Sequence, residues 1–157
     1  MSKRRSPSRR TITVTITLLV LCVAVTGCAP LLREGPRSPD RPRLLEFRLD
    51  ASSVSSGCPV RAILRFEDPE ADATQAVMGW QHDRGSRTVD RGVIPLPIEV
   101  AQLRGKTSGE VAAPLMFLQN GTYWLSVQVV DARGGRSNVL QRRLTVFAQS
   151  RALSCAD

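Results

Sequence analysis

The sequence has one histidine, four cysteines and few aromatic residues, which make up 4% of its 157 positions. A lone histidine without a Cys/His cluster supplies neither a zinc ligand set nor a nucleophile with its base. His82 and Asp83 are the one pair that resembles a base and its orienting acid, but no serine or cysteine can be assigned as their partner, so we expect His82 to be a surface residue. The length leaves room for one domain, which excludes two-domain enzymes. The composition therefore predicts a protein without catalytic activity and without a required cofactor.

Acidic residues are missing from the start of the chain, and this explains much of the formal charge of +8. Five basic residues lie within the first ten positions: Lys3, Arg4, Arg5, Arg9 and Arg10. Without residues 1–27, 17 basic residues face all 14 acidic ones and the net charge falls to +3. A basic face for nucleic acid is therefore not indicated.

The first segment has the order of a bacterial export signal. A basic stretch at residues 3–10 precedes an uncharged stretch at residues 11–27 and then Cys28, which is the order of the n-region and h-region. The residues Val25-Thr26-Gly27-Cys28 resemble the lipobox of bacterial lipoproteins. The resemblance implies that residues 1–27 are a signal peptide, that cleavage occurs before Cys28, and that Cys28 carries diacylglycerol and an acyl chain such as palmitate. The membrane is then a partner through this anchor.

Alternatives for this segment remain open. An uncleaved transmembrane helix needs roughly 20 apolar residues, and the uncharged stretch, with five threonines, is at the short and polar limit. Residues 8–12 also resemble the start of a twin-arginine signal, so the export route stays open. In every case the rest of the chain lies outside the cytoplasm in the cell envelope, because the basic flank stays inside. Ala29 stands where an aspartate favours inner-membrane retention in enterobacterial lipoproteins, which favours the outer membrane, facing the periplasm or the cell surface.

Residues 28–42, after the signal peptide, are rich in proline, with Pro30, Pro36, Pro39 and Pro42. Proline spacing of this kind favours an extended tether of about 3 Å per residue. Such a tether holds the following domain away from the bilayer. A disordered leader is the alternative.

From Leu44 onward the hydrophobic period is two. Strands are predicted at residues 45–49, 59–67, 77–82, 94–100, 122–130 and 138–147, on alternation and the turn residues between them. Pro95 and Pro97 lack backbone donors, so the fourth of these is expected at a sheet edge. No window of ten or more residues has an uninterrupted helical apolar face. Residues 43–157 are therefore predicted to form one all-β domain, an immunoglobulin-like antiparallel β-sandwich of about seven strands.

Two segments of this region resemble bacterial immunoglobulin-like and PKD-like extracellular modules. They are residues 66–72, FEDPEAD, and residues 121–135, GTYWLSVQVVDARGG. The resemblance implies that Tyr123 is a tyrosine-corner residue and that Trp80 is the core tryptophan of the third strand. PKD domains usually carry a Trp-Asp-Phe-Gly-Asp-Gly-type run, from which residues 80–85 depart, so a generic immunoglobulin-like sandwich is the interpretation.

The four cysteines divide into two groups. Cys22 leaves with the signal peptide and Cys28 carries lipid, so Cys58 and Cys155 remain in an oxidising compartment. If the strands of a seven-strand immunoglobulin-like sandwich alternate in direction, the second strand begins at the end where the last one finishes, so Cys58, before the strand at 59–67, and Cys155, after the last strand, lie at the same end. A Cys58–Cys155 disulfide is predicted, with free or intermolecular thiols as the alternative.

Strand alternation also brings the turns at residues 68–75 and 131–137 together at the opposite end, beside the tether. Four acids converge there: Asp68, Glu70, Asp72 and Asp131. Carboxylates of this kind hold calcium, but their spacing matches no calcium loop. Ion pairs with Arg133 and Arg136, or plain solvation, are the alternative.

Trp124 is the candidate binding residue. If Tyr123 and Leu125 point inward, Trp124 points outward. A large aromatic residue there is either a contact residue or is covered by a neighbouring loop or by Arg142 or Arg143. The function hypothesis is a non-catalytic, lipid-anchored envelope module that binds a protein or a glycan. A structural spacer or assembly subunit is the alternative, and an envelope enzyme or enzyme inhibitor is the least favoured.

Overall fold

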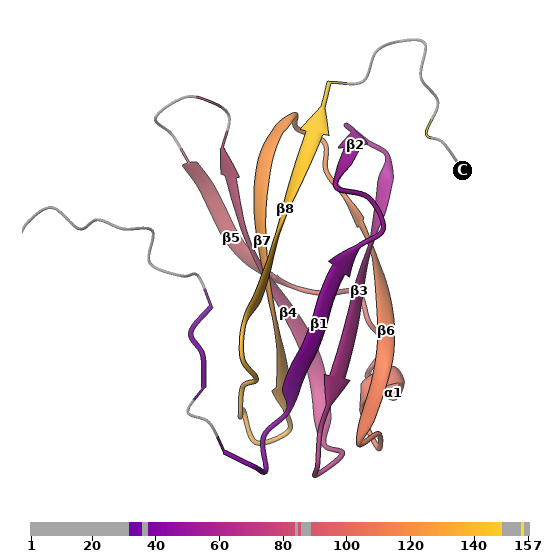
Figure 1. Cartoon of the computed structure of the whole chain (residues 1–157), viewed down its shortest axis with the longest axis vertical. Coiled ribbons are helices and arrows are strands. Elements are labelled where there is room, and N and C mark those ends of the chain that lie inside the picture. The colour runs from indigo at the N-terminus through magenta and orange to yellow at the C-terminus, as the bar shows by residue number, and fades with distance from the viewer. Residues whose placement is uncertain (1–31, 36–37, 84, 86–88, 149–154, 156–157) are drawn as a thin grey trace, which may run out of the picture.

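The computed structural model describes residues 32–35, 38–83, 85, 89–148 and 155, and these residues form a two-sheet β-sandwich of the immunoglobulin, fibronectin III and PKD type (Figure 1). One sheet has the order β1-β3-β6, with β1 at Arg43–Leu49, β3 at Pro59–Glu67 and β6 at Ser108–Met116. The other has the order β2-β8-β7-β4-β5, with β2 at Ser53–Ser55, β8 at Leu140–Phe147, β7 at Gly121–Asp131, β4 at Ala73–Asp83 and β5 at Val89–Pro95. A single helical turn, α1, spans Val100–Leu103. The predicted fold class is confirmed.

Strict alternation of apolar residues creates the core between the sheets. In β3 the alternate residues Val60, Ala62, Leu64 and Phe66 are buried, and in β7 the same holds for Tyr123, Leu125, Val127 and Val129. Because successive side chains of a strand point to opposite faces, each of these strands presents one apolar face to the other sheet. These two strands are confirmed, and burying one such large aliphatic or aromatic side chain contributes about 1.5–3 kcal/mol.

The first strand differs from its prediction. The strand expected at residues 45–49 rests on the alternation of Leu45, Phe47 and Leu49, but Leu44 and Phe47 are the buried residues and Leu45 is only half-buried. The pairing of β1 with β3 shifts register between Leu44 and Glu46. One extra residue in a strand reverses the face of everything that follows, so the prediction was wrong for Leu45.

Three elements were not predicted: β2, α1 and β6. The expected strand at 94–100 ends at Pro95 and gives way to α1, while β5 lies at the edge of its sheet, as the prolines predicted. Strand β6 alternates Val111, Ala113 and Leu115 inward, but its glycine, alanines and Pro114 have low strand propensity. Its edge position explains how Pro114 is tolerated.

The end of the predicted tether is docked on the domain and is not extended away from it. Leu32 is 3% exposed, and the side-chain amide of Gln128 donates to the carbonyl oxygens of Arg33 and Ser137 at 2.8 and 2.7 Å. Gln128 is itself fully buried on the outer face of the five-stranded sheet. The proline content of this segment gives no sign that its backbone binds Gln128. The expected extended tether is therefore wrong for residues 32–35.

The predicted signal peptide at residues 1–27 and the predicted lipidation site Cys28 lie outside the described residues. Within the part of the chain that the structure describes, no helix has the length and apolar character that crossing a membrane requires. The predicted disulfide is present: Cys58, directly before β3, is bonded to Cys155, with the two Cα atoms 5.4 Å apart.

Candidate functional site

The two acidic turns meet at the end of the sandwich where β7 ends, as predicted. The backbone N–H of Ala132 donates to the carbonyl oxygen of Asp72 at 3.0 Å. The guanidinium of Arg133 lies 2.9 Å from Glu70 and 4.0 Å from Asp72. This guanidinium is largely exposed, so its ion pairs contribute no more than about 1 kcal/mol each.

The other two acids hold backbone groups. The Asp68 carboxylate accepts the N–H of Ala73 at 2.7 Å, and both residues are fully buried. The Asp131 carboxylate accepts the N–H groups of Arg133 and Gly135 at 2.8 and 2.6 Å. Short side-chain bonds of this kind close turns where no strand partner is available.

These contacts favour the ion-paired alternative over calcium. Each of the four acids has at least one oxygen engaged with Arg133 or with a backbone donor, while Oδ1 of Asp68 and Oδ1 of Asp72 are buried without a hydrogen bond among the described residues. Among the described residues, no group of three or more His, Cys, Asp or Glu side chains is arranged to hold a metal ion. The site that the structure favours at this end is a pair of closed turns.

Substituting Asp68 by alanine tests this assignment. The change leaves the buried N–H of Ala73 without its acceptor, and the expected loss is about 2 kcal/mol in the free energy of unfolding, measured in urea. Asp68→Asn keeps an acceptor oxygen and is expected to recover most of the loss. A rise of the wild-type midpoint on adding calcium that disappears in both variants would support the metal hypothesis instead.

His82 is not a surface residue, contrary to expectation. It is 1% exposed, its ring stacks on Tyr123 with centroids 4.1 Å apart, and its Nε2 lies 3.0 Å from the carbonyl oxygen of Asn120. Because a carbonyl oxygen only accepts, this nitrogen carries a proton. Alternation already placed His82 on the face of Met78, so its burial was readable from the sequence. The residue is a packed and hydrogen-bonded part of the interior.

Tyr123 has the geometry of a tyrosine corner. Its hydroxyl donates to the carbonyl oxygen of Gln119, four residues upstream, at 3.1 Å. Trp80 is half-buried against the core, and its indole lies directly over Gly92 of β5. An aromatic ring over a strand glycine replaces the missing side-chain contact. The tryptophan therefore lies nearer the surface than the core tryptophan that the resemblance implied.

Trp124 points outward, as expected, and is 49% exposed. The guanidinium of Arg143 lies over its ring, 5.9 Å from the centroid. Arg143 therefore covers part of the ring, as the coverage interpretation expected, and the rest of the ring is exposed; a binding role for Trp124 stays a prediction.

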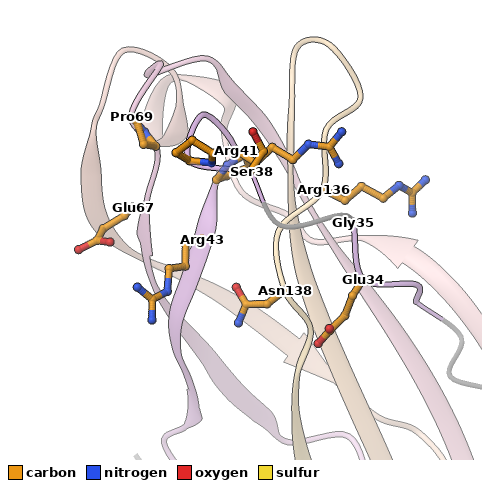
Figure 2. Close-up of a pocket in the computed structure, with 11 residues that line it drawn as sticks. Glu34, Gly35, Ser38, Arg41, Arg43, Glu67, Pro69, Arg136 and Asn138 are labelled. Atoms are coloured by element: carbon orange, nitrogen blue, oxygen red, sulfur yellow. The ribbon is translucent and has the colours of Figure 1, made fainter.

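A polar hollow of about 770 Å³ lies between the docked linker and the turn end (Figure 2). Its charged lining residues are Glu34, Arg41, Arg43, Glu67 and Arg136. Figure 2 shows Arg43 and Glu67 on one side, with Glu34 and Arg136 on the other. Because acidic and basic side chains both line the hollow, its charge favours neither anionic nor cationic ligands.

An apolar groove of about 430 Å³ lies between the two edge strands β5 and β6, at the end where β7 begins. We call it the β5–β6 groove, and its apolar lining includes Met78, Trp80, Ile94, Leu115, Met116 and Leu118. Met116 and Leu118 are 61% and 75% exposed. Apolar side chains this exposed, gathered around a hollow, are typical of a contact surface.

The backbone under this groove is fixed. The N–H of Gly57 donates to the carbonyl oxygen of Phe117 at 2.8 Å, and the hydroxyl of Ser56 donates to that of Leu118 at 2.6 Å. The disulfide of Cys58 fastens the same end. Leu118 is therefore presented on a pinned segment, which lowers the entropy lost on binding.

Sequence analysis missed this groove, although one signal was available. Residues 116–118 are three consecutive apolar residues directly before the turn residues Asn120 and Gly121. A strand end cannot bury both faces, so at least one of the three had to be exposed.

No protein-family model matches the chain, and no curated protein matches it. Solved structures share its architecture at low identity. The PKD domain of an M14-like peptidase from a Thermoplasmatales archaeon is 14% identical over 68% of this chain and 92% of its own, with a TM-score of 0.40. The third fibronectin III domain of human KIAA0343 protein is 15% identical over 80% of this chain and 99% of its own, with a TM-score of 0.44.

A family 76 glycoside hydrolase from a bovine Bacteroides thetaiotaomicron strain is 15% identical over 68% of this chain, with a TM-score of 0.46. The match spans only 20% of that enzyme. These likenesses concern architecture alone.

Proposed function

We propose that this chain is a non-catalytic, lipid-anchored module of the cell envelope that binds a protein partner through the β5–β6 groove. The lipobox-like residues before Cys28 support the anchor. The Cys58–Cys155 disulfide supports an oxidising compartment. The destination that Ala29 favours is the outer membrane.

The observation that carries the binding role is the exposed apolar rim of the groove. The rim consists of three exposed side chains: the flexible, polarisable Met116 and the branched Leu118 and Ile94. Methionine and leucine rims suit the side chains of a protein partner, whereas a glycan needs a row of polar donors and acceptors beside its aromatic platform. We therefore place the partner among proteins.

Leu118→Asp tests the proposal, with Val100→Asp as its control. Val100 is also an exposed apolar residue, but it lies in α1 and outside the groove lining. A photoreactive residue at position 116 in intact cells identifies the partner, whose affinity for purified variants is then measured. Leu118→Asp is expected to weaken binding at least about tenfold, and Val100→Asp to leave it unchanged.

Two results would contradict the proposal. Equal affinities for both variants would place the contact elsewhere, and the absence of any crosslinked protein would favour a spacer. Attachment is checked separately: palmitate labelling in cells should mark the wild type and be lost in Cys28→Ser.

A further inference from the structure

The outer face of the five-stranded sheet presents one ordered row of side chains. Cross-strand pairing aligns Arg91 with Gln81, Gln81 with Trp124 and Trp124 with Arg143. All four point away from the core, because the residues beside Trp124 in β7 are buried. An exposed tryptophan therefore lies in one cross-strand row with an exposed arginine at each end. Asp83, which pairs with Thr122, is an acidic residue in the next row on this face.

The N-terminal segment joins the domain on this same face. Gln128 follows Trp124 and Ser126 on the outward side of β7, and its amide holds the carbonyl oxygen of Arg33. Leu32 is buried beside it. The chain thus leaves the domain from the middle of a sheet face.

The distance from this docking point to Cys28 is short. Cys28 lies four positions before Leu32, and a fully extended chain over four positions spans at most about 14 Å. A lipid on Cys28 therefore holds this face, rather than an end of the sandwich, next to the bilayer. A globular protein of 100 residues has a radius of gyration of about 13 Å. Its full width therefore exceeds the space between this face and the bilayer, so a partner protein does not fit there.

We propose that the outer face of the five-stranded sheet lies against the headgroup layer of the bilayer, with Trp124 at the interface and Arg91 and Arg143 on lipid phosphates. The proposal rests on the lipid anchor at Cys28. Tryptophan favours the membrane interface because its ring is amphipathic. Guanidinium groups bind phosphate through paired N–H donors. The bilayer is thus the partner of Trp124, and the β5–β6 groove, on an edge of the sandwich, stays open.

The test uses the acylated full-length protein in vesicles of phosphatidylcholine and phosphatidylglycerol. The lipids carry bromine near the headgroup end of their acyl chains, which quenches nearby tryptophan. Trp124→Phe gives the signal of Trp80, the only other tryptophan, so Trp124 is obtained by difference. Its emission is expected to be quenched at least about twice as strongly as that of Trp80.

Charge reversal provides the matched control. Arg91→Glu is expected to lower, about fivefold or more, the equilibrium constant between the sheet face bound to the bilayer and the same face free of it, as obtained from the quenching of Trp124. Arg142→Glu makes the same change one residue from Arg143, on the side of β8 that carries the buried Leu144 and Val146, and is expected to change nothing.

Three results would overturn the inference. The first is equal quenching of both tryptophans, and the second is equal effects of Arg91→Glu and Arg142→Glu. The third is quenching of Trp124 that disappears when the protein is diluted in the vesicles, because contact with a second copy of the chain would then cause it. An unacylated wild type would instead refute the proposed anchor, so the two failures are distinguishable.

Discussion

Replacing Gly121 by alanine is expected to lower the free energy of unfolding by about 4 kcal/mol. Gly121 opens β7 with φ at 138°, a conformation that residues with a side chain rarely adopt. A Cβ there would lie 2.5 Å from His82 Nε2 and 2.7 Å from the carbonyl oxygen of Asp83. Backbone strain and overpacking each cost about 1–3 kcal/mol.

Neither neighbour can move away cheaply. The His82 ring is held by its stacking on Tyr123 and its bond to Asn120, and the Asp83 carbonyl belongs to the backbone of β4. A domain of this size has about 5–15 kcal/mol of total stability, so the variant loses a large share of it. Urea unfolding monitored by tryptophan fluorescence measures the change.

Gly105→Ala separates strain from collision. Gly105 has φ at 77° and nothing within 4 Å of the added Cβ, so the expected loss is about 1–2 kcal/mol. A His82→Ala background should also reduce the cost of Gly121→Ala, because it removes one of the two clashing atoms. Equal losses at positions 105 and 121 would show that the close approach to His82 does not exist.

Strands with strict alternation were predictable from the sequence, and those with interruptions were not. In β3 and β7 one face is apolar throughout and the other is mainly polar, so the burial of the apolar face follows directly. The bulge at Leu45 has no local signal, because it arises from pairing with β3. Strand β6 is assembled from residues of low propensity, and only its neighbour β3 and the core make it a strand.

The candidate sites divide in the same way. The meeting of the two acidic turns and the disulfide follow from strand direction only when seven strands alternate, and β6 is the strand that completes this number. The docking of Arg33 on Gln128 and the β5–β6 groove depend on residues far apart in the sequence: 95 positions separate Gln128 from Arg33. Single-sequence patterns carry no information on such pairs.

Removing the disulfide is expected to destabilise the domain by about 2–5 kcal/mol. In the chain-entropy model, a bridge across 97 residues restricts the unfolded chain by about 4.7 kcal/mol at 25 °C. Cys155 lies eight residues after Phe147, where β8 ends. The bridge also closes the eight positions between Phe147 and Cys155 into a loop in the native state. The same expression gives that loop an entropic cost of about 2.5 kcal/mol, and subtracting it from the roughly 4.7 kcal/mol sets the lower limit.

Cys155→Ser is the cleaner of the two single substitutions. Cys155 is exposed, whereas Cys58 is 4% exposed and belongs to the buried apolar set. Cys155→Ser therefore breaks the crosslink without altering the interior, and Cys58→Ser adds the cost of a buried hydroxyl, about 1–3 kcal/mol. The difference between the two variants measures the burial of Cys58, and their shared part measures the bridge.

Guanidinium unfolding under reducing conditions gives both quantities. Cys155→Ser should unfold at the same midpoint as the reduced wild type. Its m-value should exceed that of the oxidised protein, because an unfolded chain without the crosslink exposes more surface. An oxidised wild type no more stable than Cys155→Ser would mean that the bridge restricts the native tail as much as it restricts the unfolded chain. The bridge would then serve to hold residue 155 beside the β5–β6 groove end rather than to stabilise the sandwich.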